Sequence, residues 1–161
     1  MHADIDGAVR IARLAAEFDW TGKVNDLEPF CAAAGWELVQ GEDISPWIRT
    51  DFAVNSPVAP VHLMKRQIDL VSIYATDLAD PEAPYTLVER EVNDCFVELG
   101  QALTDTLGTP TRREAGDDAM LGWDLPKIVI RLTASDAIVV LELVSRQYQA
   151  ELDEYREEDD D

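Results

Sequence analysis

The longest helical pattern of this chain lies between two groups of strand patterns, and this arrangement restricts the fold class. Between Tyr85 and Leu107, apolar side chains recur every three or four positions and form one stripe: Val88, Val92, Cys95, Phe96, Leu99 and Leu103. Pro84 precedes the pattern, and Gly108 and Pro110 end it. We therefore expect one long central helix over about residues 85–107.

Strand patterns come before and after this helix. Residues 47–54 alternate, with Ile48, Phe52 and Val54 on one face. Six further apolar or alternating segments predict extended chain: 36–40, 61–65, 68–76, 120–125, 127–132 and 137–144. Residues 41–46 and 55–60 are rich in turn formers and are expected to be loops. The sequence predicts an α+β fold, in which an antiparallel sheet of about five to six strands has its helices packed on one face.

Two helices are expected before the strands. The first runs to about Phe18 and has Asp4 or Asp6 as its N-cap. The second is short, with the capping box Asn25-x-x-Glu28 at its start and Gly35 at its end.

The C-terminal end is polar and acidic. A final helix is predicted from about Arg146 to Glu157, followed by an acidic tail at residues 158–161. The sequence contains no internal repeat and no linker, so residues 1–157 are expected to form a single domain.

The formal net charge is -20, from 33 Asp and Glu against 13 Lys and Arg. Such a charge attracts cationic macromolecules, while phosphate backbones and anionic lipids repel it. We expect a partner protein with a basic surface, and neither a nucleic acid nor a membrane as partner. The first ten residues lack the basic and apolar pattern of a secretory signal, so a cytoplasmic protein is expected.

The chain shows no pattern typical of a catalytic, cofactor or metal site. His62 has no His or Cys close to it in sequence, and residues 116–118 form a turn signal without a phosphate-binding pattern. Carboxylates are so numerous that any pair at catalytic spacing carries little information. Cys31 and Cys95 lie in apolar helical patterns and are expected to be free thiols. We expect a protein that is not an enzyme and that holds neither cofactor nor metal.

Acidic groups and nearby aromatic residues are the candidate contacts for a partner, although acidity by itself also serves solubility. The candidates are Glu42, Asp43, Trp47, Asp77, Asp80, Glu82, Tyr85, Tyr148, Glu151, Asp153, Glu154, Tyr155, Glu157 and Glu158.

Two resemblances add to this interpretation. Trp20-Thr21, Asp26-Leu27, Phe30 and the run 33–37 (AAGWE) resemble the opening of an uncharacterised actinobacterial family of small acidic proteins. That resemblance implies an immunity-type partner of a toxin and brings no catalytic residues. The order of helices and strands also resembles the architecture of type III secretion chaperones.

These observations favour one function over two others. The expected function is that of an immunity protein, an antitoxin that covers the active site of a secreted toxin domain with an acidic surface. A secretion chaperone for an effector protein is the alternative, and a small acidic enzyme is the third possibility.

Overall fold

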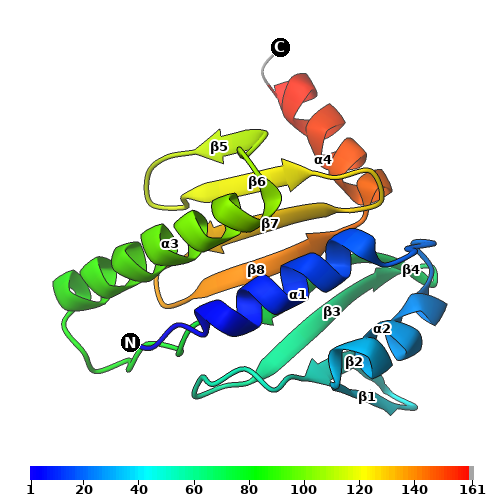
Figure 1. Cartoon of the computed structure of the whole chain (residues 1–161), viewed down its shortest axis with the longest axis horizontal. Helices are drawn as coiled ribbons and strands as arrows, with labels where there is room; N and C mark the ends of the chain where they lie inside the picture. The colour runs from blue at the N-terminus through cyan, green and yellow to red at the C-terminus, as the bar shows by residue number, and fades with distance from the viewer. Residues whose placement is uncertain (160–161) are drawn as a thin grey trace.

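A computed structural model describes residues 1–159, which form four α-helices, one 3-10 helix and eight β-strands (Figure 1). Their bounds are α1 (Ile5–Glu17), η1 (Val24–Asp26), α2 (Leu27–Ala34), β1 (Glu37–Gly41), β2 (Ile44–Arg49), β3 (Val58–Met64), β4 (Gln67–Tyr74), α3 (Tyr85–Leu107), β5 (Arg112–Glu114), β6 (Met120–Asp124), β7 (Val129–Ala134), β8 (Val139–Val144) and α4 (Arg146–Asp159). Of the acidic tail predicted at residues 158–161, Glu158 and Asp159 extend α4, and residues 160–161 lie outside the described residues.

All strands within residues 1–159 belong to one antiparallel sheet of eight strands, in the order β1-β2-β3-β4-β8-β7-β6-β5. The prediction of about five to six strands is wrong. Residues 41–46, predicted as a loop, complete β1 and begin β2, while β3 starts at Val58 inside the second predicted loop. The three residues of β5 are all charged and carry no apolar alternation, so their sequence gave no strand signal.

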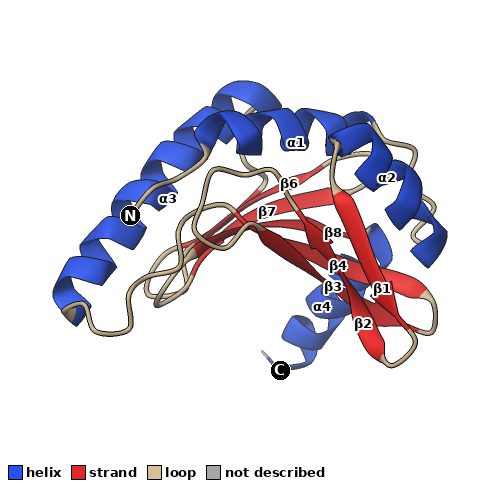
Figure 2. Ribbon diagram, turned by 90° about the horizontal axis from the view of Figure 1, so that it is seen from below, coloured by secondary structure: helices blue, strands red, loops and turns tan. Residues whose placement is uncertain are grey.

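The predicted placement of the helices is also wrong. Helices α1, α2 and α3 cover one face of the sheet, and α4 lies on the opposite face (Figure 2). Helix α3 has the predicted bounds, yet it packs beside α1 and over β7 and β8 and is not central. The polar sequence of α4 does not indicate that this helix packs on the sheet, because its contacts with the sheet are made mainly by charged and amide groups.

The core lies between the sheet and helices α1 to α3. Fully buried side chains from both layers fill it, among them Ile11, Leu99, Leu103, Ile48, Ile73, Ile130, Leu132 and Leu141. One end contains a chain of aromatic rings, in which Phe30 lies 4.9 Å from Trp20 and 6.1 Å from Trp36 between centroids. Burial of this apolar surface is the main source of stability.

The two N-terminal helix starts differ in how well the sequence predicted them. Of the two predicted N-caps, Asp4 caps α1 by accepting a hydrogen bond of 2.9 Å from the Gly7 amide, and Asp6 lies in the first turn. The predicted capping box of the second helix is wrong, because Asn25 lies within η1 and α2 begins only at Leu27. The buried Asp26 carboxylate instead accepts bonds from the Thr21 and Gly22 amides.

Candidate functional site

The face of the sheet opposite α1 to α3 carries a second set of apolar side chains. Trp47 lies opposite Pro60, and Tyr74 lies opposite Val140 in the strand register. Their sequence neighbours Ile48 and Ile73 point to the other face and are fully buried. We call the following residues the open face: Val39, Trp47, Arg49, Val58, Pro60, His62, Leu70, Ser72, Tyr74 and Val140.

The apolar members of the open face are all half-buried. Figure 2 shows that α4 does not extend below β1 and β2 on this side, so this half of the face has no helix from residues 1–159 over it. The Arg49 guanidinium lies 5.4 Å from the centre of the Trp47 ring and also pairs with Glu37. The open face is therefore an apolar surface with few charges on it.

An arginine fork attaches α4 to the other half of the same face. Arg112 of β5 donates to Asp124 Oδ1 at 2.6 Å and to Asp153 Oδ1 at 2.8 Å. These bonds hold the pKa values of Asp124 and Asp153 below their usual range and raise the pKa of Arg112. Arg131 of β7 adds a 3.1 Å bond to Gln149 on α4. These charged contacts fix the direction of α4 across the sheet.

The side of α4 turned away from this fork carries tyrosines and glutamates at helical spacing. Tyr148, Glu151, Tyr155 and Glu158 recur every three or four residues and share one face, which we call the tyrosine–glutamate stripe. Burial raises the pKa of Asp69 on β4, the negative charge of Glu151 raises it further, and the positive charge of His62 opposes both. Glu151 of the stripe therefore lies close to β4.

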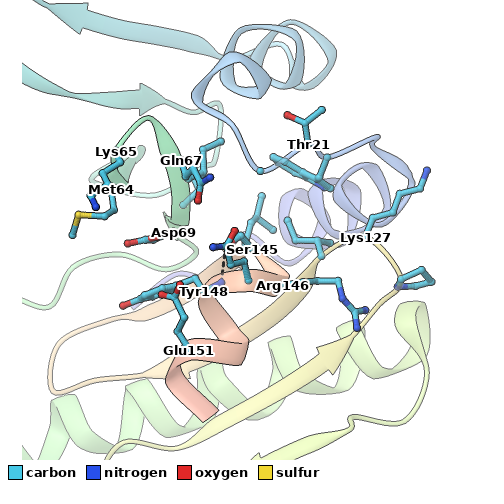
Figure 3. Close-up of a pocket in the computed structure, with 18 residues that line it drawn as sticks. Thr21, Met64, Lys65, Gln67, Asp69, Lys127, Ser145, Arg146, Tyr148 and Glu151 are labelled. Atoms are coloured by element: carbon cyan, nitrogen blue, oxygen red, sulfur yellow. Dashed lines mark hydrogen bonds between the residues drawn. The ribbon is translucent and has the colours of Figure 1, made fainter. Parts of the chain in front are cut away.

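A groove of about 860 Å³ adjoins the stripe where β4 and β8 meet α4 (Figure 3). Its sides come from the loop after α1, the β3–β4 turn, the β6–β7 turn and the first turns of α4. Met64, Asp69, Tyr148 and Glu151 lie together in it. Lys65, Lys127 and Arg146 also line the groove, so it combines apolar surface with side chains of both charges.

The predicted contact residues fall into separate regions. Glu42 and Asp43 form the exposed turn between β1 and β2, and Trp47 lies on the open face. Tyr148 and Glu151 line the groove, and Tyr155 is 67% exposed on the same stripe as Glu158. Glu154 and Glu157 are exposed on α4 outside the stripe.

Three of the predicted carboxylates have internal partners within the described structure. Asp77 accepts bonds from the backbone amides of His2 and Asn55, at 2.9 and 2.8 Å. Asp80 accepts one from the Glu82 amide at 2.9 Å, and Asp153 is bound by Arg112. These carboxylates stabilise loops and α4, and are less available to a partner.

Tyr85 lies away from the other aromatic candidates. It begins α3 and is 64% exposed, and the charges of Glu89 and Asp136 raise its pKa.

Sequence reasoning missed most of the open face. Leu70, Ser72 and Tyr74 alternate with buried residues in the segment predicted as the strand 68–76, and two of these three are large and apolar. A strand with apolar residues on both faces indicates that both faces are covered. That signal pointed to a second layer, either α4 or a partner.

The groups that usually carry catalysis or metal binding are sparse in the described structure. Within residues 1–159, no three His, Cys, Asp or Glu side chains converge to hold a metal ion. Cys31 and Cys95 are free thiols, as predicted, and both are buried. Burial raises the pKa of the Cys31 thiol to about 11, which disfavours the nucleophilic thiolate.

Comparison with protein families gives one match. A "Family of unknown function (DUF6301)" matches residues 6–145. The chain belongs to the DUF6301 family. This membership confirms a family relationship but supports neither the actinobacterial origin nor the immunity-type role that the sequence resemblance implied. The DUF6301 match ends one residue before α4 begins, so α4 lies outside the matched region.

This DUF6301 chain was also compared with solved structures and with curated proteins. It is similar to a solved structure of a DUF4309 family protein (YjgB) from Bacillus subtilis subsp. subtilis str. 168, with 15% identity and a TM-score of 0.43, covering 88% of this chain and 99% of that chain. No curated protein matches. Among residues 1–159 there is no helix with the length and hydropathy needed to cross a membrane.

Proposed function

We propose that this protein is a non-catalytic inhibitor that binds a basic protein partner, as an immunity protein binds a toxin domain. The observation that carries the proposal is the combination of a net charge of -20 with an apolar sheet face that has no helix of residues 1–159 over β1 and β2. An apolar surface supplies affinity, and opposite charge supplies fast and selective association. An immunity protein needs both, and it would act in the cytoplasm of the cell that makes the toxin.

A secretion chaperone would use the same surface differently. It would hold an extended, unfolded effector segment, whereas an inhibitor would contact a folded domain. The charge supports a folded basic target, because enzymes that act on nucleic acids or nucleotides carry positive active-site clefts.

The test begins with the tagged full chain in extracts of its native cell at low and high salt. A partner retained only at low salt is then purified and recombined with the chain in known amounts. We expect a one-to-one complex in which the activity or toxicity of the partner falls. A partner that is unfolded in the complex would replace the proposal with the chaperone function, and turnover of a small molecule by the chain alone would refute both.

A further inference from the structure

We infer that the open face and the tyrosine–glutamate stripe of α4 form one docking surface for a basic amphipathic helix of the partner protein. The inference rests on the proposed function and names the surface and the kind of segment that it would use.

The apolar character of the open face is the first argument. A sheet face that meets only water normally carries polar side chains in alternation with the buried ones. Here Trp47, Pro60, Leu70, Tyr74 and Val140 occupy those positions and are half-buried. An exposed apolar area of this kind marks a binding surface more often than a solvated one.

The second argument is the space beside α4. Strands β1 to β4 are neighbours in the sheet, and three spacings of about 4.8 Å give them a width of roughly 14 Å. An α-helix with its side chains is about 10–12 Å across. One helix therefore fits over these strands, next to α4, in the same way that α1 and α2 cover the other face.

The charged side chains around the open face indicate what kind of segment would bind there. The stripe places Glu151 beside β4, at one side of the open face, and Asp69 lies next to Glu151 in the groove. Glu42 and Asp43 lie at the opposite side, in the β1–β2 turn. A helix with an apolar stripe would contact the open face, and Lys or Arg on its flanks would meet both acidic borders.

Charge also disfavours a second copy of this chain as the occupant. Two molecules that each carry a charge of -20 repel one another as they approach, and an acidic peptide would be repelled in the same way. Tyr148 and Tyr155 on the stripe add large amphipathic side chains, which are typical anchors at protein interfaces.

The experiment selects helical peptides from a phage-displayed library against the purified full chain at low ionic strength, and measures the affinity of the recovered peptides as synthetic probes. We expect selected peptides with an apolar stripe flanked by Lys and Arg. The double variant Trp47→Ser with Val140→Ser should weaken them at least about tenfold. Glu151→Gln with Glu158→Gln should slow association about threefold or more at low salt, and much less at high salt.

Matched variants on α3 serve as controls. Leu87→Ser with Val97→Ser removes apolar side chains that are 41% and 67% exposed, and Glu89→Gln with Glu98→Gln removes two exposed carboxylates. Neither should change affinity by more than about twofold. Circular dichroism confirms that each variant is folded, and the two glutamine pairs test the surface even if the serine variant fails to fold.

The outcomes separate the two proposals. If basic peptides bind the α3 variants more weakly, and bind the open-face and stripe variants as tightly as the unchanged chain, the proposed docking surface is wrong. The proposal of a basic partner protein would still stand. Selection of acidic peptides, or of none, overturns both the docking surface and the proposed function.

Discussion

The two faces of the sheet are built in different ways. On the face covered by α1, α2 and α3, apolar side chains from helices and strands are fully buried, and aromatic rings pack at centroid distances of 4.7 to 6.1 Å. On the opposite face, α4 is held by charged hydrogen bonds from Arg112 and Arg131, and apolar residues of β2 to β4 remain half-buried. The first face thus has what a stable core requires, and the second has the character of an interface.

This contrast separates stability from recognition. The family match covers residues 6–145, from the second residue of α1 through β8, and stops before α4. Helix α4 then adds tyrosines and carboxylates beside the open face. Substitutions on the first face should lower stability, and substitutions on the second should mainly alter binding.

The largest expected effect is in the aromatic part of the core. Phe30 has no exposed surface and contacts Phe18, Trp20 and Trp36. Phe30→Ala should reduce the free energy of unfolding by about 3–5 kcal/mol, because it leaves a cavity that the rings cannot fill. Chemical denaturation measures this change in the free energy of unfolding. Tyr155→Ala on α4 is the control and should stay within about 0.5 kcal/mol; equal losses in both variants would refute the contrast.

The next effect concerns the attachment of α4. Arg112→Ala removes the fork and leaves Asp124 and Asp153 without the cation that bridges them. We expect a loss of about 2 kcal/mol in stability, concentrated in α4. Hydrogen exchange should show faster exchange in residues 146–158 and little change in α1. The adjacent, exposed Arg113→Ala should have almost no effect; uniform acceleration across the chain would contradict a local attachment.

Acid should act on the same contact. Because the pKa values of Asp124 and Asp153 are lowered in the folded state, their ion pairs stabilise α4 fully above the ordinary Asp pKa of about 3.9. That stabilisation is lost as the pH falls through the lowered values. Hydrogen exchange at decreasing pH should detect α4 opening before the core does. Simultaneous opening of α1 and α4 would show that the two faces form a single unit.

The smallest effect is expected on the open face itself. Arg49→Ala removes a guanidinium from above the Trp47 ring and should lower stability by about 0.5 kcal/mol or less. Acrylamide should then quench Trp47 fluorescence more strongly, since its ring becomes more accessible, and a Trp47→Phe background identifies its signal. If Arg49→Ala instead lowered the free energy of unfolding by several kcal/mol, the open face would be part of the stabilising core.

The sequence predicted local structure better than assembly. The bounds of α3, the Asp4 cap and Gly35 at the end of α2 follow from helix periodicity and capping, which depend on neighbouring residues. The predicted number of strands was too low in part because β5 consists of three charged residues. They form a strand only by pairing with β6, which their own sequence does not indicate. The side on which α4 packs depends on Arg112 meeting Asp153, which are 41 residues apart and give no local signal.

The candidate site was predicted only in part. Trp47, Tyr148 and Glu151 were identified by their residue types, but Asp153, Asp77 and Asp80 have internal partners that only the tertiary structure reveals. The remaining open-face residues come from five different strands, and sequence alone does not establish that these strands are neighbours.

The most direct test of a binding face is a hydrogen-exchange map of the chain in complex with the purified basic partner from its native cell. We expect protection in β2, β3, β4 and the stripe of α4, with exchange in α3 unchanged. Protection confined to α3 and the loops around Tyr85, with the open face unaltered, would contradict the account.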